Sequence, residues 1–245
     1  METQSRCITF ALCLVLAGTG FAARASGPQD EAAQVSGLTG KELAAFKANM
    51  DEVRVTDKQL PGSEKDVSAE QAKRMTTKEL IAQTGRQKLI VLSMLYENPN
   101  IGLYRASRCS NSVAELLGRK DFTAAFLQAY SSFDPDPKAH PHFEDEGGVF
   151  ALGWMLLLAD YPPLQSRSAG HEKEVLSALC RKYREMQKVN ASYPEGQSPY
   201  GPGCFALDTA QRLARKVFPK ARILSVRTQG DVELGVRELE QLCGS

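Results

Sequence analysis

The sequence predicts an all-α protein, and three of its features support this prediction. Apolar residues recur at helical spacing almost throughout residues 68–245, and capping boxes open several of these segments. Alternation of apolar and polar residues does not persist over successive segments, which disfavours a sheet-based fold. The helices should form either an irregular helical domain or a short stack of helix pairs.

The second arrangement, an α-α superhelix of the HEAT or tetratricopeptide type, rests on an internal similarity. The stretch from Glu79 to Asn98-Pro99 resembles the stretch from Glu115 to Asp134-Pro135 at an offset of about 34 to 36 residues. In such repeats each helix pair buries its apolar face against the next pair. The tetratricopeptide consensus of Trp, Gly and Tyr at fixed positions does not occur, so both arrangements stay open.

Residues 1–25 have the pattern of a secretory signal peptide. Arg6 provides a positively charged N-terminal region, and an apolar run extends over residues 8–20. Ala23-Arg24-Ala25 is a small-x-small cleavage sequence. The apolar run is too short for a transmembrane helix, which needs about 20 residues. We therefore expect an exported chain, periplasmic or secreted, without a transmembrane anchor. Cleavage is expected after Ala25, and Ala22 is the alternative site.

The composition is that of a globular chain without a dominant charge. The 245 residues are 42% hydrophobic and 24% charged, and their formal net charge is +1. Loss of Arg6, Arg24 and Glu2 with the signal peptide brings this charge to zero. A nucleic-acid-binding protein needs an excess of Lys and Arg for phosphate contacts, and a disordered chain has fewer apolar residues. Both classes are therefore disfavoured.

Cysteine content predicts a fold held by two disulfides. Cleavage of the signal peptide removes Cys7 and Cys13 and leaves four cysteines: Cys109, Cys180, Cys204 and Cys243. An even number in an oxidising compartment indicates disulfides, and the spacing leaves all three pairings open. The paired C-x2-C spacing of a structural zinc site does not occur.

Residues 26–67 contain few large apolar side chains, and we interpret them as an arm or linker that precedes a single helical domain at 68–245. One amphipathic helix is expected in the arm, at residues 39–53. A capping box at Thr39 and Glu42 opens it, and a narrow apolar stripe follows at helical spacing: Leu43, Phe46, Met50 and Val53. This stripe packs either on the chain's own domain or on a partner.

The first half of the domain should contain four helical segments. A capping box at Thr76 and Glu79 opens a helix that ends at Gly85, and an apolar helix at 86–96 is closed by Asn98-Pro99. A third capping box, at Ser112 and Glu115, opens a short helix. Apolar residues at i, i+3, i+4, i+7 and i+8 predict a helix over 122–130.

The second half begins with a segment, 149–159, that is apolar on every side and should be the central buried helix, with Trp154 in or at the edge of the core. A long helix at 170–189 carries Cys180 beside its apolar stripe. Another helix opens at Asp208 and stops at Pro219. Residues 221–227 should be a short strand or an extended connector, and Asp231 should cap the last helix.

One candidate metal site lies before the buried helix. Pro141 favours an extended backbone, in which alternate side chains point the same way. The side chains of His140, His142, Glu144 and Glu146 could then converge on one ion, and imidazole with carboxylate suits zinc or copper. The alternative is a polar loop whose acidic residues lie at the positive N-terminal end of the following helix.

A second candidate is the aromatic loop 193–203, in which Tyr193, Glu195 and Tyr200 could contact a peptide or a glycan. The alternative is a simple disulfide-anchored loop. The sequence lacks the motifs of serine hydrolases, zinc proteases of the H-E-x-x-H type and phosphate-binding loops.

We therefore favour an exported, non-enzymatic helical domain that binds another protein, for example a toxin-neutralising (immunity), inhibitor or adaptor protein. The sequence does not decide whether the chain is an enzyme. The first alternative is an exported metal-assisted enzyme centred on His140 and His142, and the second is a small-ligand or lipid carrier with a pocket beside Trp154.

Overall fold

The computed structural model of the chain describes residues 31–56, 66–87, 98–140, 148–201 and 204–217, together with 239, 241 and 243. The α-helices of the first half are α1 (Glu31–Ser36), α2 (Gly40–Thr56), α3 (Ala69–Arg74), α4 (Thr77–Arg86), α6 (Pro99–Cys109), α7 (Asn111–Gly118) and α8 (Phe122–Ser132). Those of the second half are α10 (Gly148–Asp160), α11 (Pro162–Gln165), α12 (Glu172–Ala191) and α13 (Phe205–Val217). Two short 3-10 turns, η2 (Pro137–Ala139) and η3 (Ser166–Ser168), complete the described elements.

The all-α prediction is confirmed, since the described part of the chain contains helices and no strand. Whether the helices are repeats of the HEAT or tetratricopeptide type stays a prediction. Within the same residues, no helix is both long enough and apolar enough to cross a membrane.

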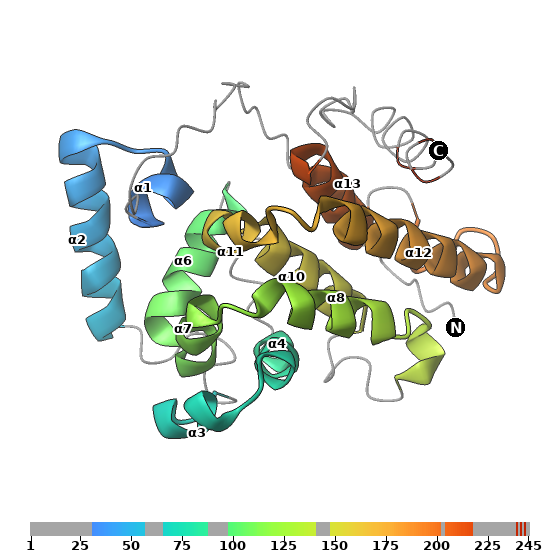
Figure 1. Cartoon of the computed structure of the whole chain (residues 1–245), viewed down its shortest axis with the longest axis horizontal. Coiled ribbons are helices and arrows are strands. Elements are labelled where there is room, and N and C mark those ends of the chain that lie inside the picture. The colour runs from blue at the N-terminus through green and yellow to red at the C-terminus, as the bar shows by residue number, and fades with distance from the viewer. Residues whose placement is uncertain are drawn as a thin grey trace, which may run out of the picture.

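Helix α10 is the centre of the fold, as its sequence predicted (Figure 1). It packs against α13, α4, α8 and α11, and its residues from Trp154 to Ala159 are all buried. Burial of Trp154 leaves its indole N–H in need of a partner, and Nε1 donates to the hydroxyl of Thr84 on α4 at 2.9 Å. Gly85 packs beside the same ring.

The stripes predicted on the neighbouring helices are confirmed as core faces. On α8, Phe122, Phe126 and Tyr130 are buried, and their rings stack in succession with centroids 6.1 and 5.4 Å apart. On α12, Leu179, Tyr183 and Met186 are buried. The helices α12 and α8 pack against each other, and α12 also packs against α13.

The start of α4 is confirmed in detail. Glu79 N donates to Thr76 Oγ1 at 3.2 Å, and Thr76 N donates to Glu79 Oε2 at 2.7 Å, which is the reciprocal capping box. The carboxylate therefore accepts hydrogen bonds from both the main chain and the hydroxyl of Thr76, and these lower the pKa of Glu79.

The predicted cap of α7 is wrong by two residues. Ser110, not Ser112, is the N-cap, and its hydroxyl accepts from the N–H of Val113. The hydroxyl of Ser112 is buried and bonds instead with Asp66 and Gln87, which lie far away in the sequence. Gln87 bonds with the hydroxyl of Ser110 as well, so the contact with Asp66 is what distinguishes Ser112 from Ser110.

Helix α6 was not predicted, because Asn98-Pro99 was interpreted as the end of the preceding helix. In the structure Asn98 is the N-cap of α6, with Oδ1 accepting from the N–H of Asn100 at 3.0 Å, and Pro99 occupies the first turn. Proline is favoured at the first helical position because its missing N–H has no intrahelical partner there. The Asn98-Pro99 dipeptide therefore marks the start of α6 and not the end of the preceding helix.

Helix α13 also differs from its prediction, since it begins at Phe205, three residues before the expected cap at Asp208. Asp208 lies in the first turn, where a negative charge is favourable, and pairs with Arg212 at 3.2 Å.

The helices within the predicted arm pack on the rest of the chain. Ala32 and Val35 of α1 and Met50 of α2 are buried in the common core. Helix α2 packs against α6, where the ring centroids of Phe46 and Tyr104 are 5.9 Å apart. Leu43, Phe46 and Met50 of the predicted stripe thus face their own chain, and the side chain of Val53 lies outside the described part. The arm and domain boundaries themselves stay a prediction.

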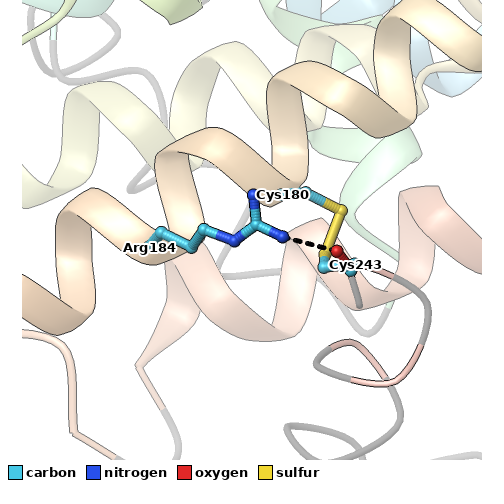
Figure 2. The surroundings of a disulfide bond; sticks show 3 residues. All are labelled: Cys180, Arg184 and Cys243. Carbon is cyan, nitrogen blue, oxygen red and sulfur yellow. Dashed lines mark hydrogen bonds between the residues drawn. A yellow bond between two sulfur atoms is a disulfide. The ribbon is translucent and has the colours of Figure 1, made fainter. Parts of the chain in front are cut away.

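One of the two predicted disulfides forms, and the second does not. Cys180 of α12 is bonded to Cys243, whose carbonyl oxygen also accepts a hydrogen bond from Arg184 (Figure 2). Cys109 and Cys204 remain thiols. Cys109 ends α6, which packs on α7, α1 and α2, whereas Cys204 precedes α13, which packs on α10 and α12. A disulfide needs Cα atoms within about 7 Å, which helices in different parts of the fold do not provide.

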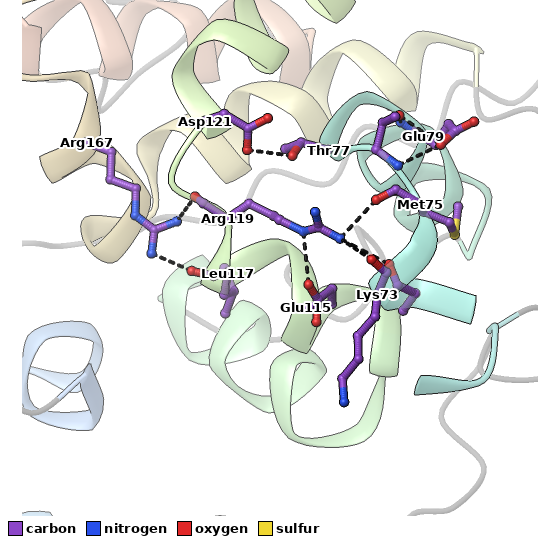
Figure 3. Close-up of polar contacts among 11 residues, drawn as sticks. Lys73, Met75, Thr77, Glu79, Glu115, Leu117, Arg119, Asp121 and Arg167 are labelled. Atoms are coloured by element: carbon purple, nitrogen blue, oxygen red, sulfur yellow. Dashed lines mark hydrogen bonds and ion pairs between the residues drawn. The ribbon is translucent and has the colours of Figure 1, made fainter. Parts of the chain in front are cut away.

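Two arginines, Arg119 and Arg167, hydrogen-bond to the C-terminal ends of helices in the first half of the chain (Figure 3). Arg119 pairs with Glu115 at 3.0 Å and donates to the carbonyl groups at the end of α3, including that of Met75 at 2.9 Å. Arg167 donates to the carbonyl groups of Leu117 and Arg119 at the end of α7. Unpaired carbonyl groups at helix C-termini are satisfied in this way by basic side chains.

Several predictions lie outside the described residues. They are the signal peptide, the apolar helix at 86–96 except for its first residues, the segment 221–227, and the start of the last helix at Asp231. Residues 239, 241 and 243 are helical, and Leu239 is buried.

Candidate functional site

The aromatic loop after α12 is firmly attached to the segment after α8. Tyr200 is only 1% exposed, and its hydroxyl donates to the carbonyl of Pro135 at 2.6 Å. Asn190 bonds with both main-chain groups of Tyr200, at 3.0 and 3.1 Å. Burial also raises the pKa of Tyr200, so the phenol stays protonated. Of the three predicted binding residues, Tyr200 therefore serves to anchor the loop.

The other two predicted binding residues lie closer to solvent. The ring of Tyr193 is half-buried, the Lys138 ammonium lies 4.7 Å above its centroid, and its hydroxyl donates to Asp136 at 3.4 Å. Glu195 is exposed at the tip of the loop. Tyr193 and Glu195 are thus the part of this loop that a partner can reach.

The predicted metal loop is only partly described. His140 stacks on Phe133 with ring centroids 4.8 Å apart, and its Nε2 lies 2.7 Å from the carbonyl oxygen of Asp134. His142, Glu144 and Glu146 lie outside the described residues. Among the residues that are described, no group of three or more His, Cys, Asp or Glu side chains could hold a metal ion. The zinc or copper site thus stays a prediction, and one nitrogen of His140 already has a protein partner.

An open groove lies between α8 and α12, with a volume of about 380 Å³. Leu127 and Ala178 line it with apolar surface, and Ser131 and Ser177 contribute hydroxyl groups. Its charged lining residues all come from the first half of α12: Lys173, Glu174 and Arg181. We call this feature the α8–α12 groove. An apolar surface flanked by charged side chains is the usual composition of a protein-binding patch.

A buried lysine holds the two helices of the groove together. Lys182 of α12 is 1% exposed, and its ammonium donates to the carbonyl groups of Phe133 and Ser131 at the end of α8. Glu185 accepts a further bond from it at 2.5 Å and compensates its charge. The positive charge also lies at the negative end of α8. Sequence analysis missed this residue, although Lys182 lies three residues after Leu179 and four before Met186 and so shares the apolar face of α12.

A second cavity, of about 260 Å³, lies among α10, α11, α12 and α13. Lys216 lines it and forms a salt bridge of 2.8 Å with the buried Asp160. Burial raises the pKa of Asp160, and the nearby Lys216 ammonium partly offsets that effect. Trp154 lines neither this cavity nor the α8–α12 groove, so the ligand pocket suggested beside it has no counterpart in these two sites.

Comparisons with models of protein families, with curated proteins and with solved structures found no match to this chain. The geometry and chemistry of the site itself are therefore the basis for assigning a function to this chain.

Proposed function

We propose that this chain is an exported, non-enzymatic protein-binding domain of the toxin-neutralising, inhibitor or adaptor kind, and that its partner binds in the α8–α12 groove. The observation that carries the proposal is the composition of this groove, in which an apolar floor adjoins two exposed basic side chains, Lys173 and Arg181. Grooves of this kind take a helix or an extended segment of a partner protein.

The groove also has the rigidity that recognition needs. Lys182 fastens α12 to the end of α8, and the disulfide from Cys180 fastens the C-terminal segment to the middle of α12. A surface built on two packed helices loses little conformational entropy when a partner binds. The loop that presents Tyr193 and Glu195 extends from the end of α12, and Tyr200 anchors it.

Export is supported by the Cys180–Cys243 disulfide, because such bonds persist in oxidising compartments and are rare in the cytosol. Mass spectrometry of the protein isolated from the producing cells tests this part of the proposal. The mature chain should begin at Ser26 and should be found in the periplasm or the medium. A chain that keeps its first 25 residues in the cytosol would contradict it.

Site-specific photocrosslinking in the producing cells tests the binding function. A photoreactive amino acid at exposed Ser177 in the groove should give a crosslink to one protein, identified by mass spectrometry. The same amino acid at Lys78, an exposed position on α4, is the matched control and should not capture that protein. Absence of a crosslink at Ser177, or equal capture at both positions, would refute the proposed interface.

A further inference from the structure

We infer that the partner segment in the α8–α12 groove is acidic and carries two carboxylates about two helical turns apart. This inference rests on the proposed function and specifies the chemistry of the partner. It depends on the charges that α12 presents and on which of them the protein already uses.

Basic side chains of α12 divide into two groups. Lys182 bonds with α8 and Glu185, and Arg184 donates to the carbonyl of Cys243, so both are occupied within the protein. Lys173 and Arg181 have no ion-pair or hydrogen-bond partner among the described residues, and both are exposed at the groove. Arg119, Arg212 and Lys216 are paired with carboxylates, whereas exposed Arg74 and Lys78 resemble the two groove cations in having no ion pair among the described residues. What distinguishes Lys173 and Arg181 is that both line one groove.

The acidic side chain in the lining does not neutralise these two cations. Glu174 lies 3.8 Å from His171 Nδ1, toward the start of α12 and away from Arg181. The lining of the groove therefore has one more positive charge than negative. Because the mature chain as a whole is expected to be neutral, this excess is local to the groove and favours an acidic ligand.

The spacing of the cations sets the spacing of the carboxylates. Lys173 and Arg181 are eight residues apart on one helix, which separates their Cα atoms by about 12 Å along the axis and about 80° around it. A partner helix with Asp or Glu at positions i and i+7 or i+8 has carboxylates at a similar separation. Lys188 continues the exposed basic row one further step along α12.

The apolar floor distinguishes a protein segment from other anionic ligands. Half-buried Leu127 lines the same groove as the basic side chains and offers apolar contact to a peptide, while Ser131 and Ser177 offer hydrogen bonds to its polar groups. A flat anionic membrane surface would meet the charges without filling the groove. We therefore assign the site to an acidic peptide segment, and binding to lipid is an outcome of the test.

A pair of synthetic peptides tests this inference. The probe is a helical peptide with leucines on one face and two glutamates eight residues apart, and the control peptide has glutamine at both positions. By fluorescence anisotropy at low salt, the mature protein should bind the glutamate peptide roughly two- to thirty-fold more tightly, the range expected for two exposed ion pairs. Added salt should reduce this preference.

Two matched double variants locate the effect. Lys173→Gln with Arg181→Gln should abolish the preference, whereas Arg74→Gln with Lys78→Gln, two exposed cations on α3 and α4, should keep it. Far-UV circular dichroism should show that both variants are folded. Equal binding of the two peptides, no binding of either, or equal loss in both variants would overturn the inference. Charge-dependent binding to phosphatidylglycerol vesicles without peptide discrimination would overturn it in favour of a lipid surface.

The crosslinking experiment separates failure of this inference from failure of the proposed function. If Ser177 captures a partner and the Lys173→Gln, Arg181→Gln variant captures it equally well, the groove binds a protein but the acidic segment is wrong. If the capture falls at least several-fold in this variant and not in the Arg74→Gln, Lys78→Gln control, both are supported. If Ser177 captures nothing, the proposed function itself is wrong.

Discussion

Removal of the Cys180–Cys243 disulfide should cost the protein about 4 kcal/mol of unfolding free energy. The bond joins residues separated by 63 positions, and it restricts the unfolded chain by closing that loop. The loop-closure relation for about 63 residues gives an entropy of about 14 cal/mol/K, or about 4 kcal/mol at 25 °C. In a domain of this size such a change lowers the melting temperature by about 8 to 16 °C.

Urea unfolding of the oxidised mature protein, followed by circular dichroism, measures this effect in the Cys180→Ala, Cys243→Ala variant. Reduction of the wild-type protein should destabilise it similarly, and reduction of the variant should change nothing further. Cys109→Ala, Cys204→Ala is the matched control, because both residues are thiols in the structure. A loss below about 1 kcal/mol would refute the loop-closure reasoning. A further loss when the Cys180→Ala, Cys243→Ala variant is reduced would reveal a second disulfide and contradict the structure.

Three substitutions and one elemental analysis test other features of the protein. Because the folded-state pKa of Glu79 is lowered, Glu79→Gln should lower the unfolding free energy at neutral pH. This difference in unfolding free energy from wild type should disappear as the pH falls below about 4.3 and through the lowered pKa. A difference that persists at low pH would contradict the capping box. Tyr200→Phe removes a buried hydrogen bond and should cost about 1 to 2 kcal/mol in urea unfolding, whereas no cost would mean that the loop is not anchored there. Lys182→Met leaves helix-end carbonyl groups without a donor and should cost about 2 kcal/mol, with exposed Lys188→Met as a control within about 0.5 kcal/mol. Elemental analysis of the mature protein should find no stoichiometric zinc or copper; one equivalent that is lost in the His140→Ala, His142→Ala variant would instead support the metal-assisted enzyme.

Features that depend on neighbours within one or two helical turns were predictable. The stripe on α8, the uniformly apolar α10 and the capping box of α4 each follow from side chains a few residues apart. One error arose where two local signals competed. Ser110 and Ser112 are both acceptable caps, and Ser112 alone of the two bonds with distant Asp66. The short helices α1, α3 and α11 were not predicted.

The candidate site was predictable only in part. The aromatic loop could be identified from its composition, but the burial of Tyr200 depends on Pro135, which lies 65 residues away. Helical spacing from Leu179 and Met186 places Lys182, and not its neighbour Arg181, on the buried face of α12. Only the placement of α8 shows which carbonyl groups satisfy the buried ammonium of Lys182.

By itself the sequence determined the helical class and most helix positions of the described chain, because hydrophobic period and capping act over a few residues. It also supplied four cysteines beyond the predicted signal peptide. The tertiary structure decided that Cys180 pairs with Cys243, that Lys182 supports α8, and that Leu127 of α8 meets Lys173 and Arg181 of α12 in one groove. These contacts join residues distant in the sequence, so they exist only once the helices have docked and buried their apolar faces together.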